Sequence, residues 1–208
     1  MTMNNKEYRS APLAVADQPE DNQMIVTGYA AVLEQPTVIC SIDGINYYEV
    51  IDKDAFVGAD LSDVPFKYNH SDDFLVLART RNKTLDLNVD TKGLLIKANL
   101  APIQAGKDVY GLIQRGDIDK MSFGFTVAND SYDSQTRTRR ILKFEKIWDV
   151  SAVDTPAYDG TSIDVDDGSA ISARSYFSAK RDAEKLVQKE QAEQQNKEQR
   201  DRLYLMTL

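Results

Sequence analysis

The stretch KMSFGFTV, residues 120–127, alternates apolar side chains with small or polar ones. Because successive side chains of a β-strand point to opposite faces of a sheet, Met121, Phe123 and Phe125 would share one face. Ser122 and Gly124 would share the other, with Gly124 leaving open space beside the serine hydroxyl. The pattern therefore predicts a strand whose apolar side packs into a core. On the strand alone, Ser122 is either part of an ordinary polar outer face or a nucleophile on a rigid element.

Similar runs on both sides of this stretch predict a mainly β fold. Between Met24 and about Val153, short runs of Val, Ile, Tyr, Leu and Phe are separated by Gly, Pro, Asn and Asp. Two short helices, over 52–59 and 105–117, interrupt the strands, and the second should end at Gly116. So many closely spaced strands favour a barrel or sandwich with helices on its flanks. The expected strands are 24–33, 45–51, 65–69, 74–80, 84–89, 94–100, 120–127, 138–147 and 150–153.

Composition divides the 208 residues into four segments. Residues 1–23 are polar and turn-rich and should form a flexible N-terminal arm, followed by the β domain over 24–158. Residues 159–172 read as an acidic linker of small residues. Residues 173–208 are rich in charge and poor in apolar positions, which predicts a helical extension that is solvated or binds a partner along one face.

Charge and hydropathy exclude several function classes. A formal net charge of -8 argues against a nucleic-acid or anionic-membrane binder, since phosphate binding needs concentrated Lys and Arg. We find no apolar run near the roughly 18 residues of a transmembrane helix and no signal-peptide core, so we expect a protein kept in the cytoplasm. The single cysteine, Cys40, precludes an internal disulfide and reads as a buried structural thiol rather than a nucleophile. No metal-ligand spacing occurs, and we expect neither a metal nor a cofactor.

His70 is the only histidine, so any Ser–His mechanism depends on it. It lies in FKYNHSDDF, where an expected strand gives way to a turn. A serine hydroxyl needs a neutral imidazole to accept its proton, and the imidazole needs an acceptor that fixes its orientation. Asp149 is the favoured acceptor, because a carboxylate in the apolar setting of WDVSAV requires a partner. The other candidates are Asp72, Asp73 and Glu145, of which Glu145 is the main rival.

The order of YNHS (68–71), KMSFGF (120–125) and WDVSAVDTPAY (148–158) resembles the prohead maturation proteases of tailed bacteriophages. The resemblance extends from about Gly28 to Tyr158. These enzymes are in turn similar to the herpesvirus assembly protease. The resemblance therefore implies a mainly β fold with flanking helices (α+β). It also implies a closed or partly closed antiparallel β-barrel, here with a C-terminal helical extension.

The same resemblance implies a serine endopeptidase with Ser122 as nucleophile, His70 as general base and then acid, and Asp149 orienting His70. Its substrates would be the scaffolding protein or the scaffold-like segment of the major capsid protein, and the enzyme itself, inside the immature capsid in the host cytoplasm. Oxyanion donors and self-association are left open. One alternative is a non-catalytic capsid-assembly protein with the same fold. The other is a partner-binding β domain in which Ser122 and His70 are incidental.

Overall fold

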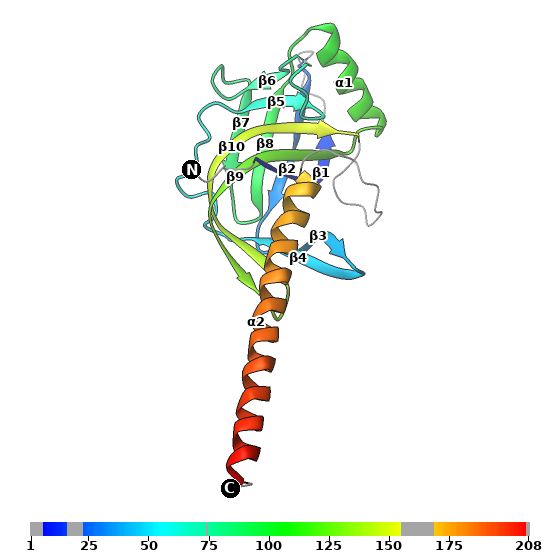
Figure 1. The fold of residues 1–208 in the computed structure, drawn as a ribbon. Helices are drawn as coiled ribbons and strands as arrows, with labels where there is room; N and C mark the ends of the chain where they lie inside the picture. The colour runs from blue at the N-terminus through cyan, green and yellow to red at the C-terminus, as the bar shows by residue number, and fades with distance from the viewer. Residues whose placement is uncertain (1–5, 16–22, 74, 155–168, 207–208) are drawn as a thin grey trace.

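The computed structural model describes residues 6–15, 23–73, 75–154 and 169–206. Within them the fold is mainly β with two helices, one of them C-terminal, which confirms that part of the expectation (Figure 1). In chain order the elements are β1 (Glu7–Val15), β2 (Ile25–Val32), β3 (Thr37–Ile42), β4 (Ile45–Ile51), β5 (Pro65–Tyr68), β6 (Ala78–Arg79), β7 (Leu85–Val89), β8 (Gly93–Asn99), α1 (Gln104–Arg115), β9 (Lys120–Asp133), β10 (Thr138–Val153) and α2 (Ser169–Met206).

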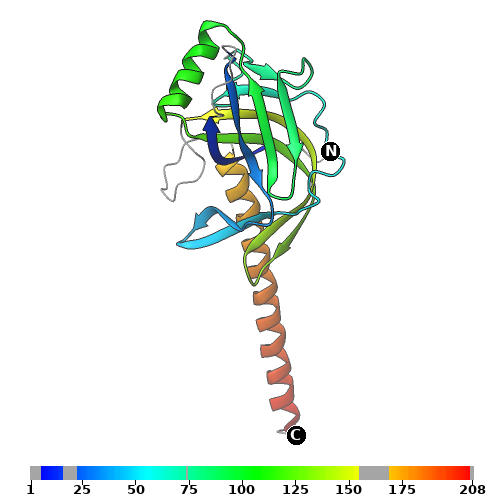
Figure 2. The ribbon, with the colours of Figure 1, turned by 180° about the vertical axis from the view of Figure 1, so that it is seen from behind.

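All the strands belong to one curled sheet (Figures 1 and 2). The pairing order is β3-β4-β10-β9-β1-β2-β8-β7, with β5 on β10 and β6 on β5. Over the described residues the order does not close on itself, so closure into a barrel is not observed. Most neighbouring strands are antiparallel as expected, but β10 pairs in parallel with β4 at one end and with β5 at the other. At 16 residues, β10 is long enough to take two different neighbours along one edge.

Several strands fall close to their predicted positions, and β4 coincides with the predicted 45–51. The predicted helix over 52–59 is wrong: there the N–H groups of Ala55, Val57 and Ala59 each bond to a carbonyl three residues earlier, forming successive turns. Gly58 in this segment has φ +77°, a left-handed conformation that a continuing α-helix cannot accommodate. Of the predicted strand over 74–80, only β6 forms.

The N-terminal segment differs most from expectation. Instead of a flexible arm, β1 lies inside the sheet, antiparallel to β9 on one side and to β2 on the other. This strand is not recognisable from the sequence, because Glu7 and Arg9, which alternate along it, are charged and yet buried. Their charges are paired inside the protein, so the usual apolar signature of a buried strand is missing.

The core lies on the concave side of the sheet, where the predicted apolar set of β9 is fully buried. α1 packs onto this core through Val109 and Ile113. As predicted, the helix stops at Gly116, which adopts φ +81° and donates its N–H to carbonyls of the last turn. The buried β9 side chains are Met121, Phe123 and Phe125.

The C-terminal helix α2 is attached to the sheet only near its start. Ala173 and Phe177 are buried, and the Phe177 ring packs against Tyr47 at a centroid distance of 4.9 Å. Beyond this contact the helix extends well past the sheet (Figure 1), and Leu186 and Val187 are exposed. It begins at Ser169, slightly before the predicted 173, and most of the expected acidic linker lies outside the described residues. Neither helix in the described part of the chain is both long and apolar enough to span a membrane.

Candidate active site

β9 presents Ser122 on the face opposite the core. The ladder pairs Ser122 with Ser151 of β10 and Gly124 with Asp149. Directly paired residues of an antiparallel ladder project on the same face, about 5 Å apart at their Cβ atoms. Ser122, Ser151 and Asp149 therefore share one face of the sheet, on the side away from Phe123.

A β-bulge turns Asp149 towards this face. Ile147 pairs with the core residue Phe125, whereas Asp149, two positions later, pairs with Gly124, and the register shift lies between them. In a regular strand, residues two apart share a face, so the extra residue, Trp148, reverses the direction of Asp149. Trp148 itself is 41% exposed, whereas the Asp149 side chain is fully buried.

The turn after β5 carries His70 over the same face. Asn69 and His70 both have positive φ, at 50° and 53°, an uncommon conformation for two successive non-glycine residues. The end of β10 holds this turn: the Asn69 N–H donates to the Ala152 carbonyl (2.9 Å), and the His70 N–H donates to Ser151 Oγ (3.3 Å). The strained backbone is thus fixed by hydrogen bonds that aim the imidazole at β10.

The imidazole is paired with the predicted acid. His70 Nδ1 is hydrogen-bonded to Asp149 Oδ1, and Ser151 Oγ lies 3.3 Å from the same nitrogen. Ser151 also donates to Asp149 Oδ1 at 3.2 Å. His70 Nε2 is buried and has no hydrogen-bond partner in the described residues. One nitrogen of the ring is therefore held by the acid, and the other is available to accept a proton.

Asp149 is held as a carboxylate. Burial alone would raise its pKa, but the hydrogen bond and charge of His70, together with Lys6, lower it to about 2. Lys6 reaches the second carboxylate oxygen, with its Nζ 2.5 Å from Oδ2. Both oxygens of a fully buried acid are thus satisfied by partners from two distant segments.

Ser122 lies beside this pair without bonding to it. Its side chain is almost fully buried, and no hydrogen bond joins its hydroxyl to His70 in the described structure. The ring of Tyr8 packs against the His70 ring at a centroid distance of 4.1 Å, and Tyr8 pairs with Gly124 in the β1–β9 ladder. The face around Ser122 is therefore covered by the N-terminal strand.

A family comparison bears on this arrangement. The model of the caudovirus prohead serine proteases matches residues 12–175, which include His70, Ser122 and Asp149. The chain belongs to this family. Membership indicates serine protease activity in general and a role in capsid maturation. No match was found among curated proteins or among solved structures.

Within this prohead protease the rival residues lie elsewhere. The Glu145 side chain is exposed, and only Asp149 among the candidate acids is bonded to His70. Asp72 forms an ion pair with Lys67 instead. Burial raises the pKa of the Cys40 thiol to about 11, so it is protonated at neutral pH and a poor nucleophile.

Sequence reasoning missed three residues of this face of the prohead protease: Lys6, Tyr8 and Ser151. Ser151 could have been found, because it lies in the predicted strand 150–153, two positions after Asp149, and extending that strand back to Asp149 puts both residues on one face. Lys6 and Tyr8 carried no such signal, since the segment around them was interpreted as a flexible arm. The family match begins only at residue 12, after both of them.

Proposed function

We propose that this protein is the serine endopeptidase of a phage prohead, with Ser122 as nucleophile, His70 as general base and Asp149 as the residue that orients His70. Its substrates are the scaffolding protein or the scaffold-like segment of the major capsid protein, and the enzyme itself. The observation that carries the proposal is the His70–Asp149 pair: the acid holds Nδ1, Nε2 has no hydrogen-bond partner in the described residues, and Asp149 shares a sheet face with Ser122.

The chemistry follows from this arrangement. His70 Nε2 takes the Ser122 proton as Oγ attacks the carbonyl carbon of the substrate, and Asp149 stabilises the imidazolium through Nδ1–H. His70 then gives that proton to the leaving amine as the peptide C–N bond breaks, leaving an acyl group on Ser122. Water, deprotonated by His70, releases the acid product and restores the serine.

The proposal requires Ser122 and His70 to approach each other when substrate binds. Catalytic hydrogen bonds are often long in unliganded enzymes and shorten in the substrate complex. The near-complete burial of Ser122 and the Tyr8 ring against His70 describe a closed resting site. A peptide can reach the serine only if this cover moves.

Co-expression with the cognate capsid and scaffolding proteins tests the nucleophile. Wild type should release cleaved products, seen by gel and mass spectrometry, whereas Ser122→Ala and His70→Ala should each slow cleavage by about 10³-fold or more. Ser151→Ala is the matched control, because Ser151 pairs with Ser122 and also touches His70; it should lose only about tenfold.

A fluorophosphonate probe adds a readout that needs no protein substrate, and it should label Ser122. Labelling and cleavage that persist in Ser122→Ala but vanish in Ser151→Ala would move the nucleophile to Ser151. A wild-type protein that neither cleaves nor labels would favour the non-catalytic assembly protein.

A separate experiment tests Asp149 as the residue that orients His70. Asp149→Asn should reduce kcat by about 10⁴-fold, because an amide cannot stabilise the imidazolium and favours the wrong tautomer. Glu145→Gln should leave the rate near wild type, since that side chain is exposed. A large loss in Glu145→Gln with little loss in Asp149→Asn would reverse the assignment.

A further inference from the structure

Lys6 makes a direct contact with the buried acid of the site. Its ammonium lies 2.5 Å from Asp149 Oδ2, while His70 and Ser151 occupy Oδ1. The Asp149 side chain is fully buried, and that of Lys6 is 32% exposed. A buried carboxylate needs a compensating charge, and Lys6 supplies one even when His70 is neutral.

The strand geometry leaves room for this lysine. A Cβ atom on Gly124 would lie 2.7 Å from Lys6 Cε, 2.7 Å from Tyr8 Cε1 and 3.0 Å from Asp149 Oδ2. These separations are far below ordinary contact distance, so a side chain at this position would displace Lys6 or Tyr8. The space that the glycine opens beside Ser122 is therefore filled by the chain's own N-terminal segment.

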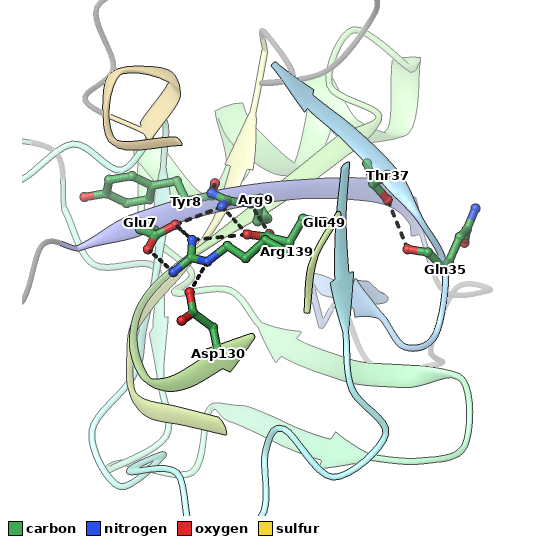
Figure 3. Close-up of polar contacts among 8 residues, drawn as sticks. All are labelled: Glu7, Tyr8, Arg9, Gln35, Thr37, Glu49, Asp130 and Arg139. Carbon is green, nitrogen blue, oxygen red and sulfur yellow. Dashed lines mark hydrogen bonds and ion pairs between the residues drawn. The ribbon is translucent and has the colours of Figure 1, made fainter. Parts of the chain in front are cut away.

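The opposite face of β1 carries charged side chains that are paired inside the protein (Figure 3). Glu7 and Arg9 pair with Phe125 and Phe123 and therefore point away from the catalytic face. Both enter a buried ionic cluster, which we define as Glu7, Arg9, Glu49, Asp130 and Arg139. Lys6, next to Glu7, is thus presented by a strand that is anchored on its other side.

We propose that Lys6 is a positioning residue of the protease, which holds the Asp149 carboxylate so that Asp149 in turn orients His70. The inference rests on the proposed roles of His70 and Asp149. An ammonium on the far oxygen of Asp149 repels a proton arriving at His70, because like charges a few ångströms apart in a buried site interact strongly.

The other charged groups around the site do not substitute for Lys6. Asp72, on the turn that carries His70, is paired with Lys67. Tyr8 contributes a ring against His70, and the Lys6 ammonium lies 4.8 Å from its centroid. Burial opposes the charge of Lys6, but the charge of Asp149 and its hydrogen bond outweigh this effect and raise the lysine pKa. Lys6 is therefore charged throughout the range in which a histidine titrates.

The sole histidine makes the test direct. In a Ser122→Ala background, which prevents self-cleavage, the single imidazole Cε1–H signal reports the pKa of His70 by NMR without peptide hydrolysis. Adding Lys6→Met should raise this pKa by about one unit, whereas adding Lys6→Arg should keep it near the parent value. Lys53→Met is the matched control, because its side chain is 74% exposed and belongs to a turn outside the site; it should move the value little.

The same substitutions are then made in the protein with Ser122. In Lys6→Met the acid limb of the pH profile of kcat/KM should move to higher pH by as much as the His70 pKa rises. In Lys6→Arg it should stay at the wild-type position. A purely structural role would lower activity at every pH without moving the limb. If Lys6→Met does not fold, Lys6→Gln, which keeps a hydrogen-bond donor but not the charge, provides the same comparison.

An unchanged His70 pKa in the uncharged variant, or an equal shift in Lys53→Met, would overturn the inference. A shifted pKa in a protein that never cleaves would instead overturn the proposed function and leave the Lys6–Asp149–His70 coupling intact. The two failures are therefore distinguishable.

Discussion

At the residue scale, Gly124 is the position at which the catalytic face has no room for a side chain. Three atoms, from Lys6, Tyr8 and Asp149, converge on the space that a Cβ would occupy. Two of these atoms are at the far ends of flexible side chains, so a substitution would move them rather than break the strand. The consequence of such a change should therefore appear in the site more strongly than in the fold.

We predict that Gly124→Ala destabilises the protein by about 1–2 kcal/mol and raises the pKa of His70 as Lys6→Met does, because the new methyl group displaces Lys6. Gly111→Ala in α1 is the matched control. No atom lies within 4 Å of its would-be Cβ, so alanine should stabilise the helix by about 0.5–1 kcal/mol. Urea unfolding and the NMR titration of His70 measure both effects. Wild-type stability and an unmoved His70 pKa in the Gly124→Ala variant would contradict the prediction.

The contact of Asp149 with His70 could be anticipated, because a carboxylate in an apolar strand needs a partner and one histidine exists; its role in catalysis stays a prediction. The route by which Asp149 reaches that face was not predictable. It depends on the bulge at Trp148, which alternation of side chains alone does not reveal. Lys6 was not predictable either, since its role depends on a contact across 143 positions of sequence.

At the element scale, β1 joins two different environments through its two faces. One face meets His70 through Tyr8, with Lys6 just before the strand reaching Asp149 on the same side, and the other face enters the buried ionic cluster. Within that cluster Arg139 contacts Glu7, Glu49 and Asp130, and its side chain is 5% exposed. The three carboxylates of the cluster already outnumber its two guanidinium groups, so the loss of either cation leaves still more negative charge without a partner.

We therefore expect Arg139→Met to destabilise the protein by about 3–5 kcal/mol, the usual effect of removing one partner of a buried ion pair. The neighbouring Arg140 is a matched control on the same strand. Its side chain is 36% exposed and pairs with Glu34 and Asp52, so Arg140→Met should cost less than about 1 kcal/mol. Denaturant titrations of the two variants would show the contrast, and equal losses would refute the view of β1 as anchored by this cluster.

The same charges explain why the fold of β1 could not be predicted. Sequence reasoning identifies buried strands by apolar alternation, and it worked for β2, β4 and β9. In β1 the inward positions Glu7 and Arg9 are charged and are paired with Arg139 and Glu49, which lie far away in sequence. The predicted helix over 52–59 is wrong for a different reason. The segment contains Gly58, which adopts a left-handed conformation that an α-helix cannot contain.

At the scale of the whole molecule, the buried carboxylates link stability to pH. The pKa of Asp149 is lowered to about 2, and that of Glu7 is also lowered, because arginine charges and hydrogen bonds outweigh its burial. A carboxyl with a lower pKa when folded stabilises the protein above its unfolded value, near pH 4. That contribution is lost as the pH falls through the folded value.

The free energy of unfolding should therefore fall steadily between pH 4 and pH 2. For Asp149 the contribution is about 2 kcal/mol. In Asp149→Asn the fall should be smaller by about that amount, as measured by urea unfolding at several pH values. An identical pH dependence in the variant and in wild type would show that Asp149 does not contribute.

The order of these segments along the chain determines when, during synthesis, the site can form. The site combines Lys6 before β1 with His70 after β5, Ser122 in β9 and Asp149 near the end of β10. A ribosome makes the first of these long before the last, and contacts between distant segments form slowly because the intervening chain must be closed into a loop. A nascent chain, or a fragment that ends before β10, therefore contains Ser122, the proposed nucleophile, together with His70 but lacks Asp149, the acid that would orient the imidazole. We therefore expect proteolysis by the proposed site to begin only after most of the chain has been made.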